Sequence, residues 1–185
     1  MAAAGKLQYV YLAFLSKPKE DRQLFRLVGR LRATRIVELG IGSLPRTLNL
    51  IRVCQRYSPE QVVRYTGLDW FEERPAGLRP LSLLDTHRQL AAEGAKPRLM
   101  PGGPGQALPA VANNLLGTDL VLISSLADAQ SLAGCRLFLP RILTPTSVVL
   151  AVQPQPDGRC AWRELDHADI AAGAKAVVTS GAKAA

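Results

Sequence analysis

The chain has 185 residues, of which 48% are apolar and 21% are charged, a balance that argues against disorder along its whole length. Lys and Arg together number 23 against 15 for Asp and Glu, and this excess of positive charge favours an acidic partner such as nucleic acid. Its apolar runs fall short of the roughly 20 residues of a membrane-spanning helix, and the early stretch YVYLAFL lacks a secretory cleavage pattern, so we expect a cytoplasmic protein without a membrane partner.

The sequence offers little support for metal or redox chemistry. Cys54, Cys135 and Cys160 are far apart and odd in number, which fits a reducing compartment. Neither His87 nor His167 has a second imidazole or thiol at the interval that metal ligands use. We therefore predict that the chain has no metal site.

Residues 1–34 contain an apolar segment followed by a basic helix. Arg22, Arg26 and Arg30 recur every four residues opposite a leucine-rich face, as in an amphipathic helix with a solvated basic side. The same side would suit the phosphates of a nucleic acid, and that alternative stays open. The apolar segment is expected to pack across the sheet or against a second copy of the chain in a homodimer.

Residues 35–153 alternate short apolar runs with helical patterns, which is typical of strand–helix units that build a parallel sheet. Strands are predicted at 35–39, 62–69, 97–102, 118–125 and 146–153. Helices are predicted from about 43 and over 79–96, 106–117 and 128–143. The expected fold is a doubly wound, mostly parallel α/β sheet of five to six strands with helices on both faces. Residues 154–185 are expected to form a short, turn-rich C-terminal extension with a loosely held end.

The stretch RIVELGIGSLPR places a carboxylate and two glycines at the end of the first predicted strand. Glycines at 40 and 42 allow a tight turn that brings backbone amides against a ligand as the next helix begins. Asp69 ends the second predicted strand, 27 residues beyond Gly42, where a carboxylate could accept two hydrogen bonds from a ribose diol. Glu38 is costly at the edge of a core unless a positive or hydrogen-bonding group meets it.

These features resemble class I S-adenosylmethionine-dependent methyltransferases over roughly residues 20–153. VELGIGSLPR is similar to their first motif, YTGLDW to their second-strand acidic motif, and RLMPGGPGQALPAVANNLLGTDLVLISS to their adenine-contacting loop, helix and fourth strand. The resemblance implies S-adenosylmethionine as cofactor, with Glu38 near its ammonium group and Asp69 on its ribose. The cofactor-binding residues that it implies are Glu38, Gly40, Gly42, Asp69, Trp70, Gly102, Gly103 and Ser124.

Simpler interpretations of these residues stay open. Glu38 could form an ion pair with a neighbouring arginine, Asp69 could be an ordinary turn residue, and Trp70 could belong to the core. A nicotinamide-binding sheet also uses Gly-x-Gly, but its third glycine would fall at Pro45 and its acidic position closer, about 20 residues on.

The sequence departs from the methyltransferase pattern on the substrate side. Leu44 stands where many of these proteins have a third glycine, PGGPG lacks the acid that meets adenine, and few residues follow the fifth strand. No catalytic base is assigned; Ser124, Asp128, Asp166 and His167 are candidates. Three hypotheses result: a methyltransferase with an unidentified small or macromolecular acceptor, a non-catalytic methyltransferase-like scaffold, and an RNA-associated methyltransferase.

Overall fold

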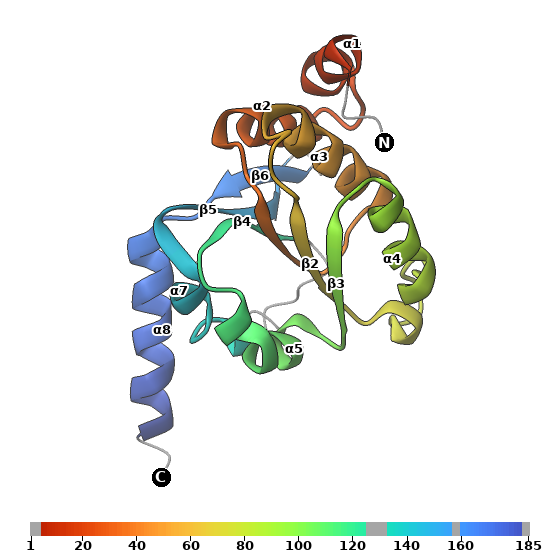
Figure 1. Ribbon diagram of the computed structural model, residues 1–185. Coiled ribbons are helices and arrows are strands. Elements are labelled where there is room, and N and C mark those ends of the chain that lie inside the picture. Colours follow the sequence, from red (N-terminus) through yellow and green to blue (C-terminus); the bar gives the residue numbers. More distant parts are fainter. Residues whose placement is uncertain (1–4, 125–132, 157–159, 183–185) are drawn as a thin grey trace.

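The structure, a computed structural model, describes residues 5–124, 133–156 and 160–182 (Figure 1). Within these ranges six strands form one sheet in the order β3-β2-β1-β4-β5-β6, parallel except for the antiparallel β5–β6 pair. The strands are β1 (Arg35–Leu39), β2 (Arg64–Asp69), β3 (Lys96–Pro101), β4 (Thr118–Ile123), β5 (Leu143–Pro154) and β6 (Cys160–Glu164). The predicted doubly wound, mostly parallel fold is confirmed.

Helices cover both faces of the sheet. They are α1 (Lys6–Val10), η1 (Tyr11–Leu15), α2 (Asp21–Leu31), α3 (Leu44–Tyr57), η2 (Phe71–Glu73), α4 (Leu83–Ala92), α5 (Pro104–Val111), η3 (Ala112–Asn114), α7 (Leu139–Ile142) and α8 (His167–Ala182). One face packs against α2, α3 and α4, and the other against α5, α7 and α8 (Figure 1). The core therefore has two layers, one on each side of the sheet.

Alternation along each strand assigns its side chains to the two layers. In β1, Ile36 joins the cluster on the α2–α3 side, whereas Val37 joins the cluster on the α5 side. Four successive residues of β4 (Leu120–Ile123) are buried. The continuous apolar run of this strand predicted such burial, because both of its faces are covered.

The observed boundaries are tighter than those predicted. The helix expected at 79–96 begins at Leu83, because the Ser82 side chain accepts a hydrogen bond from the Asp85 backbone nitrogen and caps the first turn. It ends before Gly94, which adopts a positive φ of 82°. The helix predicted at 128–143 falls partly outside the described residues; α7 occupies its last turn, with Pro140 near its start.

The prediction of a turn-rich segment after the fifth strand was wrong for Cys160–Glu164, which form β6. Only Trp162 of this edge strand is buried, so the sequence lacks the alternation that would have indicated a strand. The small-residue segment that follows forms α8, whose Ile170 packs into the core.

The N-terminal segment packs on α2 and not across the sheet. Leu12 of η1 is buried in the cluster with Leu24 and Phe25, while Leu7 of α1 is 87% exposed. Figure 1 shows α1 beyond α2, away from the sheet. In the part of the chain that the structure describes, no helix combines the length and apolar character needed to span a membrane.

Candidate functional site

The carboxyl ends of β1 and β4 mark the point where the strand order reverses. β1 pairs with β2 on one side and with β4 on the other. Gly40 turns the chain out of β1 with a φ of 75°, a left-handed conformation that favours glycine, and its nitrogen donates to the Leu68 carbonyl at 2.8 Å. Open α/β sheets bind ligands at such a reversal.

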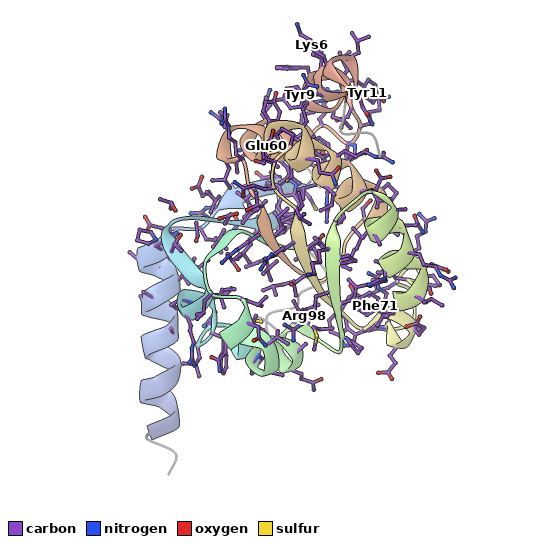
Figure 2. The ribbon with its side chains drawn as sticks, in the orientation of Figure 1. Lys6, Tyr9, Tyr11, Glu60, Phe71 and Arg98 are labelled. Atoms are coloured by element: carbon purple, nitrogen blue, oxygen red, sulfur yellow. The ribbon has the colours of Figure 1, made fainter. Side chains whose placement is uncertain are left out.

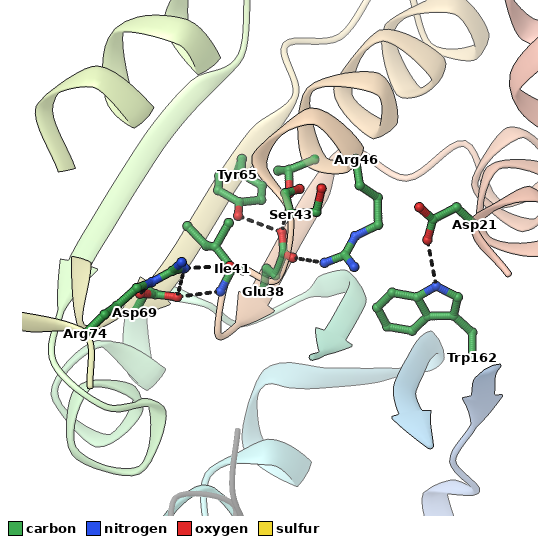
Figure 3. Close-up of polar contacts among 10 residues, drawn as sticks. Asp21, Glu38, Ile41, Ser43, Arg46, Tyr65, Asp69, Arg74 and Trp162 are labelled. Carbon is green, nitrogen blue, oxygen red and sulfur yellow. Dashed lines mark hydrogen bonds and ion pairs between the residues drawn. The ribbon is translucent and has the colours of Figure 1, made fainter. Parts of the chain in front are cut away.

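Glu38 is fully buried, and three side chains form hydrogen bonds or an ion pair with its carboxylate (Figure 3). Arg46 Nη2 lies 2.7 Å from Oε1, while the hydroxyls of Thr47 and Tyr65 each donate to Oε2 at 2.8 Å. The ion pair that the sequence left open for Glu38 is therefore present. Burial, followed by the charge of Glu38, raises the pKa of Tyr65, so its hydroxyl keeps its proton and donates.

Arg46 reaches Glu38 between a glycine and an aromatic ring. A Cβ on Gly42 would lie 3.1 Å from Arg46 Nη2, so the missing side chain leaves room for the guanidinium. The other side of Arg46 faces the ring of Trp162 on β6, 5.0 Å from its centroid, in cation–π geometry. Trp162 Nε1 in turn donates to Asp21 Oδ1 at 3.3 Å (Figure 3). These contacts connect Asp21, the first residue of α2, through Trp162 and Arg46 to Glu38.

Asp69 is also fully buried, and each of its oxygens accepts two hydrogen bonds. Oδ1 accepts from the Phe71 nitrogen at 3.0 Å and from Arg74 Nε at 2.7 Å. Oδ2 accepts from the Ile41 nitrogen and from Arg74 Nη2, both at 2.7 Å. Arg74 further donates to the carbonyls of Ile41 at 2.6 Å and Arg79 at 2.8 Å. A ribose diol could reach Asp69 only if Arg74 moved away.

The two acids lie on the same face of the sheet. Glu38 is paired with Gly67 in the β1–β2 register, and Asp69 follows Gly67 by two residues. Ile41 packs over Gly67: a Cβ added to Gly67 would lie 2.9 Å from Ile41 Cδ1, so this contact requires glycine. The Tyr65 ring is equally close, with its Cε1 3.0 Å from the same Cβ position, so Ile41 and Tyr65 together cover Gly67.

The other residues implied by the resemblance come together at neighbouring strand ends. Gly102 has a φ of 111°, and its nitrogen donates to the Asp69 carbonyl at 3.0 Å. A Cβ on Gly103 would lie 3.1 Å from the Trp70 ring, so the indole packs on this glycine. Ser124 is buried at the end of β4, and its Cβ would lie 3.4 Å from one on Gly42.

A hollow of about 480 Å³ opens beside Arg74. The loop after β1 (Ile41–Ser43) and the first two residues of α3 line one wall, and Arg79–Ser82 together with Asp85, Thr86 and Gln89 line the other. Its volume is in the range of small-molecule pockets.

Ser124 lies beside Gly42, while the other candidate general bases lie elsewhere or outside the described residues. His167 Nε2 lies 2.7 Å from the Ser147 carbonyl, near the amino half of β5, so this imidazole is away from the carboxyl ends of the strands. Asp166 is exposed, as are Asp85 and His87 on α4, and Asp128 lies outside the described residues. Among the residues that the structure describes, no cluster of His, Cys, Asp and Glu could hold a metal ion.

Sequence reasoning missed Arg46, Arg74 and Trp162. Arg46 lies eight residues after Glu38 and Arg74 five residues after Asp69, but both pairings depend on loop geometry and not on a periodic pattern. The one available signal was the presence of two arginines shortly after two acids that a core would otherwise have to bury unpaired.

Comparison with known proteins supports the fold. No protein-family model and no curated protein sequence matches the chain. Among solved structures, the cofactor-bound protein Rv0187 from MTB is similar with a TM-score of 0.51 and 19% identity, over 94% of this chain and 73% of that one. Precorrin-6y C5,15-methyltransferase from Geobacter metallireducens GS-15 gives a TM-score of 0.48 and 18% identity, over 84% and 70%. The likeness to Rv0187, together with the strand order, shows a Rossmann-like α/β fold.

Proposed function

We propose that the chain is an S-adenosylmethionine-dependent methyltransferase acting on an unidentified acceptor. The observation that carries the proposal is the placement of Glu38 and Asp69 on one face, at the carboxyl ends of adjacent strands next to the reversal in strand order. Asp69 would accept from the ribose hydroxyls, and Glu38 would face the ammonium group. When bound, the cofactor supplies a methyl group on a positively charged sulfur.

The two carboxylates suit this cofactor in type and position, but both are occupied: Arg74 and two backbone nitrogens donate to Asp69, and Arg46 pairs with Glu38. Cofactor binding therefore requires Arg74 to leave Asp69 and Arg46 to leave Glu38. The hollow beside Arg74 offers space for its side chain, and the exposed carboxylate of Asp85 on the same hollow offers a new partner. We propose that the nucleoside and Arg74 compete for Asp69.

Positioning is the main contribution that this site could make to methyl transfer. Holding donor and acceptor in line supplies much of the acceleration of such a displacement. A general base is needed only if the acceptor carries a proton of high pKa. We assign no base, because Asp166 and His167 lie away from the two acids, and Ser124, which lies beside Gly42, carries a neutral hydroxyl.

A non-catalytic scaffold is the second candidate function. The ion pairs Arg46–Glu38 and Arg74–Asp69 are both buried and together satisfy the two acids without any ligand. A protein that kept the methyltransferase fold but lost its cofactor would be expected to show this arrangement, because removing the ligand leaves two buried carboxylates that need cations.

Calorimetric titration with S-adenosylmethionine and S-adenosylhomocysteine separates the two candidates. The methyltransferase proposal predicts binding to the natural sequence and a loss of more than about tenfold in affinity for Asp69→Ala, since hydrogen bonds to a charged group contribute roughly 1.5–3 kcal/mol each. His87→Ala, on the exposed side of α4, is the matched control and should bind normally. Asp69→Ala leaves the buried Arg74 without its ion-pair partner. The double variant Asp69→Ala/Arg74→Ala therefore checks that the loss of affinity is not a folding defect.

Absence of heat at millimolar ligand, both for the natural sequence and for a variant with Arg74 shortened, would favour the scaffold.

A further inference from the structure

Cations form a row across three neighbouring strands, at the end of the sheet opposite the two acids. The register pairs Arg35 of β1 with Arg64 of β2, and Arg64 with Lys96 of β3. Arg98 is paired with Thr66, two residues further on, and therefore lies on the same face as this row. Figure 2 labels Arg98 among the side chains of this region. Adjacent strands are about 4.8 Å apart, so four positive side chains start from a small area of one face.

These cations line a cavity of about 360 Å³. Its wall on the other side is the segment between η3 and β4, which contributes the Asn114 amide and the side chains of Leu115 and Leu116. The sheet side of the lining also includes Ile36, Val37, Pro97, Thr66 and Thr118. The cavity thus joins four cations and three neutral polar residues to an apolar surface, and its volume falls within the range of ligand pockets.

The row lacks a matching set of carboxylates. None of these four cations forms an ion pair with another described residue. Asp119 lies at this end of the sheet, and its Oδ2 already accepts from the backbone nitrogens of Thr34 and Arg35 at 2.7 and 2.8 Å. Arg35 Nη1 donates to the Leu116 carbonyl at 3.0 Å, which fixes this guanidinium on the cavity wall. Like charges opposite one another in a sheet are destabilising, so the arrangement favours a bound anion.

We propose that this cavity is a binding site for a small ligand that carries two or more phosphate groups. Arginine presents planar pairs of donors that match phosphate oxygens, and a pair of phosphates can meet cations from neighbouring strands at once. Thr66 and Asn114 supply uncharged hydrogen-bonding groups, and the leucine wall takes an organic part of the ligand. The site lies at the amino ends of the strands and does not depend on the proposed methyltransferase activity.

Titration with inorganic triphosphate at low salt tests the site. The natural sequence should bind, and Arg64→Gln/Arg98→Gln should weaken binding by at least about tenfold, because each substitution removes charge-assisted hydrogen bonds. The matched control is Arg88→Gln/Arg141→Gln, which removes the same charge from exposed positions on α4 and α7 and should change the affinity by less than about twofold. Thermal melts of both double variants establish that they are folded.

Two results would overturn the proposal. One is the absence of triphosphate binding at millimolar concentration, including the case in which single-stranded RNA binds through the same arginines while triphosphate does not. The other is an equal loss of affinity in the test and control variants, which would show a general effect of net charge and no defined site.

Discussion

Arg74 forms a bidentate ion pair with Asp69, in which Nε donates to Oδ1 and Nη2 donates to Oδ2, each at 2.7 Å. The carboxylate is fully buried and the arginine side chain is 6% exposed, so the pair is shielded from solvent. Under the proposed function Asp69 is the group that would hold ribose, so Arg74 would have to leave it before a nucleoside could bind.

Replacing Arg74 with Met should have opposite effects on stability and on ligand affinity. The buried carboxylate loses its cation, so the free energy of unfolding should fall by about 3–5 kcal/mol. At the same time both oxygens of Asp69 become free to accept hydrogen bonds from a ribose, so S-adenosylhomocysteine should bind more tightly to the variant than to the natural sequence. Urea unfolding and calorimetry measure the two effects. Arg88→Met, which breaks only an exposed 3.7 Å pair with Asp85, should leave both unchanged. Unaltered affinity in Arg74→Met would contradict competition for Asp69.

Tyr65→Phe tests the buried contacts of Glu38. The variant removes the hydroxyl that donates to Oε2 at 2.8 Å while keeping the ring in the core. We expect the free energy of unfolding to fall by roughly 1.5–3 kcal/mol, because the lost hydrogen bond is to a charged group. Tyr11→Phe, at an aromatic ring that is 54% exposed, serves as the control in the same urea titration. Equal stability of the two variants would show that Glu38 does not depend on Tyr65.

Asp21 should make stability depend on pH. Burial raises its pKa above the ordinary 3.8, while Arg46 and the hydrogen bond from Trp162 oppose the rise. A carboxyl group with a higher pKa in the folded state binds its proton more tightly there, so its contribution is complete below pH 3.8 and is lost as the pH rises through the folded pKa.

Asp21→Asn removes this titration and keeps an acceptor for Trp162. The stability of the variant relative to the natural sequence should therefore increase as the pH is raised from about 4 towards neutrality. Unfolding measured at a series of pH values gives the difference directly. A difference that stays constant over this interval would show that the pKa of Asp21 is not raised.

Gly40 should not tolerate a side chain. Its φ of 75° lies in the left-handed region, where an L-residue costs about 1–2 kcal/mol. Gly40→Ala should lower the free energy of unfolding by this amount. Gly173→Ala is the opposite case, because Gly173 lies inside α8 and the nearest atom to a new Cβ is 3.8 Å away. That variant should be stabilised by roughly 0.5–1 kcal/mol. Thermal melts compare the two, and destabilisation of both would point to tight packing in place of backbone strain.

Arg64 should be destabilising in the absence of ligand. It lies between Arg35 and Lys96 in the strand register, so Arg64→Gln relieves two like-charge neighbours. The melting temperature should rise at low salt, and the gain should shrink as salt screens the charges. Arg30→Gln on α2 provides the comparison at an exposed helix position. A salt-independent effect, or a lower melting temperature, would show that these cations do not repel one another.

The sequence predicted the parts of the fold whose patterns are local. The first strand, the fourth strand and the helix after Ser43 are marked by apolar residues at their own period and by glycine or proline at their ends, so they were found with small errors at the boundaries. β6 was missed because an edge strand with one buried residue has no alternation to detect. The placement of acids at 38 and 69 was likewise predictable, because each ends an apolar run.

What the amino-acid sequence determined by itself is therefore the alternation of strands and helices and the two carboxylates at the ends of β1 and β2. Only the tertiary structure decided what meets them: Arg46 and Trp162 at Glu38, and Arg74 at Asp69. It also aligned Arg35, Arg64 and Lys96, residues that are 29 and 32 positions apart in their register pairs, at the other end of the sheet. Burial makes an unpaired charge so costly that a partner must be found, but loop conformation and strand register choose that partner, and neither is written in local periodicity.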